Sequence, residues 1–180
     1  MRRIGVAALL CLLSVGAVTR RAHRAEGAES SAKVTTRDLI VVYLSTQGVN
    51  YSPEYRASIR SIRDSVTKHM NRLEQRLVMR GVSLEPMPEA GLRDMADLGR
   101  FDELSVGGNW TNLAVVRYLG PEMGAGIRDS EIPQIVLLER DITHDGSAKL
   151  TVGEERELGR IVGTGDILDW IKRGTPIQRR

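Results

Sequence analysis

The sequence of 180 residues contains a single cysteine and only three histidines. One cysteine, Cys11, excludes a disulfide scaffold, because such a scaffold needs paired thiols. His69 and His144 have no cysteine or second histidine at the spacing of metal ligands, so no metal site is predicted. The chain also lacks a Walker motif and a Gly-x-Ser-x-Gly motif. The sequence therefore predicts no cofactor and assigns no catalytic residue.

The basic residues are unevenly distributed along the chain. The formal net charge is +3, but residues 1–26 hold five arginines and one acid. The remaining 21 basic and 22 acidic residues carry a net charge of −1. A protein that binds phosphate backbones usually has a basic surface on its folded domain. The sequence therefore predicts no nucleic-acid partner.

Long apolar runs are scarce, and residues 4–18 form the one that stands out, which excludes a polytopic membrane protein. Two arginines precede this run and small residues end it, a pattern typical of a secretory signal. Its fifteen residues would span about 22 Å as a helix, less than the roughly 30 Å of a bilayer core. Arg20, Arg21 and Arg24 follow the run and oppose export, so an uncleaved anchor remains an alternative.

These patterns divide the chain into four parts. We expect a signal peptide or membrane anchor at residues 1–18 and a flexible tether at 19–36. A folded domain should cover residues 37–174, followed by a basic tail at 175–180. The protein is expected to be exported to the periplasm or the outside of the cell. Contact with a membrane is expected only through residues 4–18, if they are not cleaved.

The clearest secondary structure in the sequence is one strand followed by one helix. Residues 39–44 are continuously apolar and rich in β-branched side chains, as in a central strand. Ser52 can cap a helix, and apolar residues at spacings of three and four predict that it runs over residues 53–80 before Gly81. Further helices are expected at 90–98, 109–119 (capped by Asn109) and 165–173, and further strands at 82–84, 101–106, 133–142, 148–152 and 160–162.

The order of these elements predicts an α/β fold with a mixed sheet. A strand that leads into a long helix implies a right-handed crossover to a parallel strand. The Asp145-Gly146 turn implies an antiparallel pair near the end of the chain. We therefore expect parallel and antiparallel strands in one sheet, with helices on both faces.

This order resembles the thioredoxin-like fold superfamily, and three landmarks sharpen the resemblance. Residues 45–53 lie between the first strand and the long helix, where that family carries its Cys-x-x-Cys motif. Ile132-Pro133 precedes a long strand, where the family has a cis-proline. The closing hairpin and helix are similar to the C-terminal end of the family. The segment 101–110 also resembles the middle of bacterial envelope thioredoxin-like proteins. The resemblance implies a three-layer sandwich over residues 37–174.

The sequence departs from this family at the positions that carry the chemistry. Val49-Asn50-Tyr51-Ser52 stands where the family has Cys-x-x-Cys. Thiol-disulfide exchange needs a thiolate, and neither valine nor serine supplies one. The resemblance therefore implies a redox-inactive member of the family that acts as a peptide-binding, protein-binding or structural module.

The resemblance also implies a cleft at this loop, in which a bound peptide would lie against the proline. Tyr51 is expected to present an exposed aromatic anchor there. Two alternatives remain open: the same residues only form a turn and a capped helix, or an enzyme with non-thiol chemistry uses the cleft between residues 48–52 and Pro133. The oligomeric state is also open. The expected cleft residues are Val49, Asn50, Tyr51, Ser52, Ile132 and Pro133.

Overall fold

A computed structural model of the protein describes residues 33–46, 51–70, 75–123, 132–144 and 149–177. The chain divides into two units, residues 1–30 and 31–180, and the described residues belong to the second unit. The expected signal peptide or anchor lies outside the described residues. The first strand begins at Val34, inside the segment expected to be a tether. Within the described part of the chain, no helix is long and apolar enough to cross a membrane.

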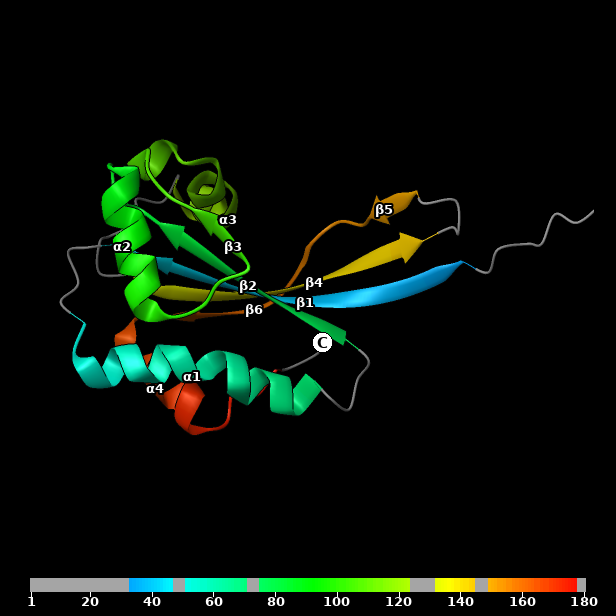
Figure 1. Cartoon of the computed structure of the whole chain (residues 1–180), viewed down its shortest axis with the longest axis horizontal. Helices are drawn as coiled ribbons and strands as arrows, with labels where there is room; N and C mark the ends of the chain where they lie inside the picture. The colour runs from blue at the N-terminus through cyan, green and yellow to red at the C-terminus, as the bar shows by residue number, and fades with distance from the viewer. Residues whose placement is uncertain (1–32, 47–50, 71–74, 124–131, 145–148, 178–180) are drawn as a thin grey trace, which may run out of the picture. The chain divides into compact units, whose positions relative to one another are not determined.

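In the part of the chain that the structure describes, six strands form one mixed sheet (Figure 1). Strands β3, β2 and β1 are parallel neighbours, and β4 pairs with β1 in the antiparallel direction. Strands β5 and β6 both pair with β4, also antiparallel. Their bounds are β1 Val34–Ser45, β2 Gln75–Ser83, β3 Glu103–Ser105, β4 Gln134–His144, β5 Leu150–Val152 and β6 Arg156–Val162.

The described residues also form four α-helices and one short 3-10 helix, of which the last, α4, follows the final strand. Figure 1 shows α1 and α4 together on one side of the sheet and α3 on the other. The predicted three-layer α/β sandwich with a mixed sheet is therefore confirmed. The helices are α1 Pro53–Met70, α2 Pro88–Leu98, η1 Asn109–Thr111, α3 Leu113–Met123 and α4 Thr164–Lys172.

The central strand β1 separates two apolar clusters. Its side chains alternate, so that Leu39, Val41 and Tyr43 join one cluster and Ile40, Val42 and Leu44 join the other. Helices α1 and α4 pack on the first cluster, and α3 packs on the second. The continuous apolar run of the sequence is therefore a strand that is buried on both faces, as predicted.

Three element predictions need correction. The long helix ends at Met70 instead of residue 80, and residues 75–80 belong to β2. Asn109 begins the 3-10 helix, and the side chain of Asn112 caps α3 by accepting a hydrogen bond from the Ala114 amide at 2.9 Å. Strand β6 begins at Arg156, four residues before the predicted strand.

The end of the domain also differs from the prediction. Thr175 is fully buried, and the Trp170 indole donates a hydrogen bond to the carbonyl of Pro176 at 3.0 Å. Thr175 is therefore packed in the fold, so a free basic tail does not begin at this residue.

Candidate functional site

The candidate site lies at the end of the sheet where β1 finishes and β4 begins. In the β1–β4 pairing Leu44 is opposite Gln134, so Ser45 and Pro133 are the next residues along at this end. The peptide bond between Ile132 and Pro133 is cis, as expected. The carbonyl of Pro133 accepts a hydrogen bond from the Gly163 amide at 2.8 Å, which joins the start of β4 to the start of α4.

The connection from β1 through α1 to the parallel strand β2, with β4 antiparallel on the other side, is the topology that the resemblance implied. The fold is thioredoxin-like. Within this fold, the loop that follows β1 leads to α1 at the same end of the sheet as Pro133. Of the six expected cleft residues, Val49 and Asn50 lie outside the described residues, and the other four are placed.

Ser52 caps helix α1, as the sequence predicts. Its hydroxyl oxygen accepts a hydrogen bond from the Tyr55 amide at 3.2 Å, and its carbonyl accepts one from the Arg56 amide at 3.1 Å. The Ser52 side chain therefore satisfies a backbone donor in the first turn of the helix. Ser52 is nevertheless exposed, so a bound molecule could reach it.

Tyr51 is not the exposed anchor that the sequence suggested. It is half-buried, its ring stacks on that of Tyr55 with centroids 4.7 Å apart, and its hydroxyl lies 2.9 Å from the Ser45 hydroxyl. Neighbouring Tyr43 and Tyr55 share a hydrogen bond of 3.2 Å between their hydroxyls. Burial raises the pKa of all three tyrosines, so they stay neutral at physiological pH.

Ile132 and Pro133 are both buried. Ile132 packs into the apolar cluster beneath α3, so its side chain is part of the core. These residues therefore reach the candidate site chiefly through their backbone. A bound peptide at this end would be recognised by main-chain hydrogen bonds more than by contacts with these two side chains.

Two carboxylates that the sequence analysis did not assign lie close to this site. Glu85 follows β2, is only 6% exposed, and accepts a hydrogen bond of 3.4 Å from the Thr46 hydroxyl. Asp94 lies on α2, and burial, followed by the negative charge of Glu85, raises its pKa. The charge of Asp94 in turn contributes to the raised pKa of Tyr51. Because β1 and β2 are parallel, Thr46 after β1 and Glu85 after β2 lie at the same end of the sheet.

Arginines of α1 tie this helix to α2. Arg56 donates hydrogen bonds to the Asp97 carboxylate at 2.8 Å and to the Tyr51 carbonyl at 3.3 Å. Arg60 donates two more to the Asp97 carbonyl, at 2.6 and 3.0 Å. The basic side chains of the helix therefore join Tyr51, just before α1, to Asp97 near the end of α2.

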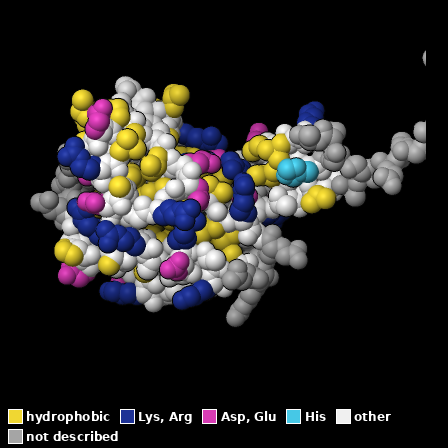
Figure 2. Space-filling view, viewed as in Figure 1, with side chains coloured by type: hydrophobic (Ala, Val, Ile, Leu, Met, Phe, Trp, Pro, Cys, Tyr) yellow, Lys and Arg dark blue, Asp and Glu magenta, His cyan; other side chains and the backbone are white. Residues whose placement is uncertain are grey.

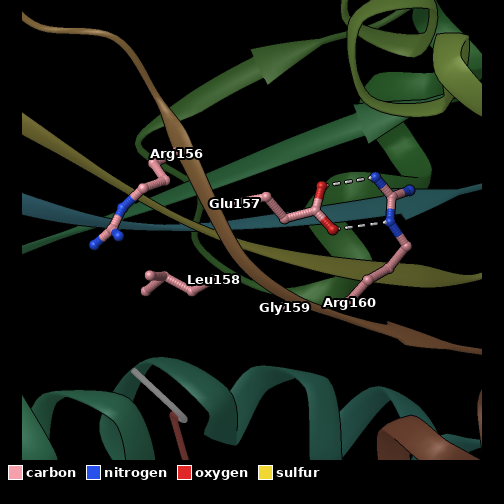
Figure 3. A pocket seen from close by; sticks show the side chains of 5 residues that line it. All are labelled: Arg156, Glu157, Leu158, Gly159 and Arg160. Atoms are coloured by element: carbon pink, nitrogen blue, oxygen red, sulfur yellow. Dashed lines mark hydrogen bonds and ion pairs between the residues drawn. The ribbon is translucent and has the colours of Figure 1, made fainter. Parts of the chain in front are cut away.

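A hollow lies along β6 and is lined by the five consecutive residues 156–160 (Figure 3). The strand has a bulge here, because Leu137 is opposite Gly159 while Leu138 is opposite Glu157. Figure 3 shows Glu157 and Arg160 bonded to each other, with Leu158 turned to another side of the strand. The charged side chains in Figure 3 already have partners: Glu157 pairs with Arg160 within β6, and Arg156 pairs with Glu139 of β4. Among the described residues, no group of three or more His, Cys, Asp or Glu side chains could hold a metal ion.

No protein-family model and no curated protein matches the sequence. Solved structures with a similar fold include a thiol-disulfide oxidoreductase from Bacteroides fragilis NCTC 9343, at 17% identity and a TM-score of 0.40, covering 76% of this chain and 80% of that one. The thioredoxin domain of a thiol-disulfide oxidoreductase from Bacteroides vulgatus is 12% identical at a TM-score of 0.37, covering 82% and 96%. A member of the Sco family of cytochrome c oxidase assembly proteins is 11% identical at a TM-score of 0.35, covering 77% and 80%. At these identities no activity transfers to this chain.

Proposed function

We propose that the protein is a redox-inactive, thioredoxin-like protein of the cell envelope that binds polypeptide at the end of the sheet beside Ser52 and Pro133. The register of β1 and β4 supports this proposal, because it sets the start of β4 against the end of β1, next to the loop that leads into α1. This is the observation on which the proposal depends. An extended chain laid across this end could pair with backbone groups, and such binding needs no thiol.

Redox chemistry by a Cys-x-x-Cys pair has no chemical basis in this sequence. The only cysteine is Cys11, and no second cysteine is available to form or resolve an intramolecular disulfide. At position 52 the hydroxyl is already used as the helix cap. A serine hydroxyl at this point stabilises the helix and does not exchange disulfides.

Export to the envelope is proposed from the leader alone, with its two arginines and the uncharged run at residues 4–18. Expression of the full chain in a bacterium with an envelope, followed by fractionation, tests this part. The proposal expects the protein outside the cytoplasm, and mass spectrometry of its N-terminus distinguishes cleavage from anchoring. Recovery only in the cytoplasm would overturn the assignment to the envelope.

An acid-base enzyme is the second candidate, and the carboxylates near the loop favour it. Glu85 is buried, the pKa of Asp94 is raised, and both lie at the sheet end beside Tyr51. We rank this function second because the Glu85 carboxylate accepts a hydrogen bond from the Thr46 hydroxyl, which gives it a structural role.

The assignment of positions 49 and 52 can be tested by restoring the thiols. The double substitution Val49→Cys with Ser52→Cys should create a pair that forms a disulfide and gains insulin-reducing activity with dithiothreitol. The unchanged protein and the single variant Ser52→Cys should both stay at background. Activity in the unchanged protein would refute the redox-inactive assignment, and a double variant that forms no disulfide would refute the positional match.

Polypeptide binding is tested with a fluorescently labelled, reduced and alkylated unfolded protein, by fluorescence anisotropy. Ser52→Asp keeps a side chain that caps helices well but adds a charge at an exposed position of the site. We expect it to weaken binding at least about tenfold, because an unpaired charge in an interface opposes docking. Ser52→Thr, which keeps both the cap and the neutrality, is the matched control and should bind as the unchanged protein does. No measurable binding by the unchanged protein would overturn the proposal.

A further inference from the structure

Helix α3 is apolar on two sides. Val115, Tyr118 and Leu119 are buried against the sheet. On its outer side, however, Leu113 is 84% exposed and Val116 is 41% exposed. A helix that packs only one face on a domain usually carries polar residues on the other. The outer side of α3 is therefore a surface that a partner would be expected to cover.

The edge strand β3 extends this apolar surface across a hollow. The hollow lies between β3 and α3 and is lined by residues of both, together with Arg80 and Tyr118. Leu104 of β3 is 46% exposed, and Leu113 of α3 also lines the hollow. The Arg80 side chain is only 11% exposed, and its guanidinium lies 5.8 Å from the centre of the Tyr118 ring. Figure 2 shows hydrophobic side chains interspersed with basic and acidic ones over the part of the molecule that holds α2, α3 and β3.

One exposed charge of each sign comes from the two sides of this hollow. The Glu103 side chain, on β3, is 46% exposed, and the Arg117 side chain, on α3, is 59% exposed. Each has an ion-pair partner within the chain: Glu103 pairs with Arg80 at 2.5 Å and Arg117 pairs with Glu155 at 3.0 Å. Arg80 and Glu155 are largely buried, so the outer sides of Glu103 and Arg117 remain open to a further charge.

We propose that this α3–β3 face docks on the same face of a second copy of the chain, around a two-fold axis. A surface with a cation on one side and an anion on the other side of an apolar centre is complementary to itself when rotated by half a turn. Arg117 of each copy then meets Glu103 of the other, so the pair forms twice. Leu113 of each copy, which lines the hollow, then packs towards Leu104 of the other copy, and both side chains lose contact with water.

Charge complementarity favours a second copy over a partner that carries charges of only one sign. A partner that is only acidic would be repelled by Glu103, and one that is only basic would be repelled by Arg117. A second copy supplies both charges in the matching arrangement. This face is formed by α3 and β3, whereas the proposed polypeptide site involves the loop before α1 and the start of β4. The two proposals can therefore fail independently.

Sedimentation velocity of the full chain over a range of concentrations tests the proposal. We expect a monomer–dimer equilibrium. Arg117→Glu and Glu103→Arg should each raise the dimer dissociation constant at least about tenfold, because each places like charges opposite one another twice. An equimolar mixture of the two variants should associate as the unchanged protein does, since both cross-subunit pairs are then restored. This rescue in the mixture is specific to a two-fold interface.

The apolar centre is tested by Leu113→Asp, which should abolish the dimer. This residue is in the first turn of α3, where an acid suits the helix dipole, so the variant is expected to fold. Leu92→Asp is the matched control, because Leu92 is 47% exposed on α2 and does not line the hollow. A monomer at every concentration, single charge variants that associate normally, or a mixture that stays monomeric would overturn the proposal. Circular dichroism melting of each variant confirms that it is folded.

Discussion

The buried carboxylate of Asp38 offers the most quantitative test of how the sheet is held together. Its side chain is only 1% exposed, in the middle of the sheet between β2 and β4. Arg76 donates two hydrogen bonds to it, at 2.8 and 2.9 Å, and Arg140 donates one at 3.0 Å. Burial by itself raises the pKa of Asp38, but the two arginines outweigh this effect and hold the pKa below its usual value.

Asp38→Asn keeps the shape of the side chain and removes its charge. Arg140 is then left with its more distant partner Glu155, at 3.5 Å, and its own side chain is only 14% exposed. Removing one partner of a buried pair typically costs about 3–5 kcal/mol. Because Arg140 retains Glu155, and Arg76 is well exposed, we expect the low end of that range, about 3 kcal/mol.

Urea unfolding at neutral pH measures this loss. Asp141→Asn is the control, because both side chains of the Asp141–Arg37 ion pair are exposed. This pair should contribute less than about 1 kcal/mol to the free energy of unfolding. Because the pKa of Asp38 is lower in the folded state, the ionised carboxylate stabilises the fold at pH values above its unfolded pKa of about 3.9. This stabilisation is lost as the pH falls below that value. The difference between the unchanged protein and Asp38→Asn should therefore be constant from about pH 5 upward and shrink below about pH 4. A loss no larger than that of the control would refute this reasoning.

Three further substitutions test other contacts. Ser52→Ala removes the cap of α1 and should lower the free energy of unfolding by about 1 kcal/mol in urea; an unchanged value would contradict the cap. Gly81→Ala places a Cβ 2.8 and 2.9 Å from its two nearest side-chain atoms and should lower the free energy of unfolding by about 1–3 kcal/mol. Gly159→Ala is the control and should cost much less, because a Cβ at Gly159 meets nothing within 4 Å. Equal losses of stability in the two variants would contradict the close packing at Gly81. Glu85→Gln should lower the pKa of Asp94, because the substitution removes a nearby negative charge. Carbon-13 NMR measures this pKa, and an unshifted value would show that the two carboxylates do not interact.

The architecture could be predicted because its strongest signals are local. Residues 39–44 are apolar without alternation, and the structure buries them on both faces. Ser52 and Pro53 mark the start of α1 in the sequence, and the cap is present. The order of strands and helices, with one antiparallel turn, then limits the sheet to few arrangements.

The boundary between α1 and β2 was not predictable from spacing alone. Met70 and Leu77 continue the helical period, although Leu77 belongs to a strand. A strand buried on both faces has no two-residue alternation, so a short helix-like spacing is easily mistaken for a helix. Gly81 suggested a helix end, whereas the structure uses it for close packing: a Cβ there would lie 2.8 Å from Leu104.

The candidate site was predictable only in part, because its residues come from segments far apart in the chain. Ser52 and Pro133 are marked by motifs, but Glu85 and Asp94 carry no local pattern that sets them apart from surface acids. Only the parallel pairing of β1 with β2 brings Glu85 beside Thr46. The expected exposure of Tyr51 was wrong for a different, local reason: its ring stacks on Tyr55 of the following helix, and its hydroxyl bonds to Ser45.

The central claim is that this thioredoxin-like fold binds polypeptide without thiol chemistry at the sheet end beside Ser52 and Pro133. The most direct measurement is an amide NMR titration of the labelled protein with a reduced, alkylated unfolded polypeptide. We predict that the largest shifts occur at Tyr51, Ser52, Ile132 and Gln134, with the α3–β3 face unaffected. Shifts confined to other surfaces, or none at millimolar polypeptide, would contradict the account.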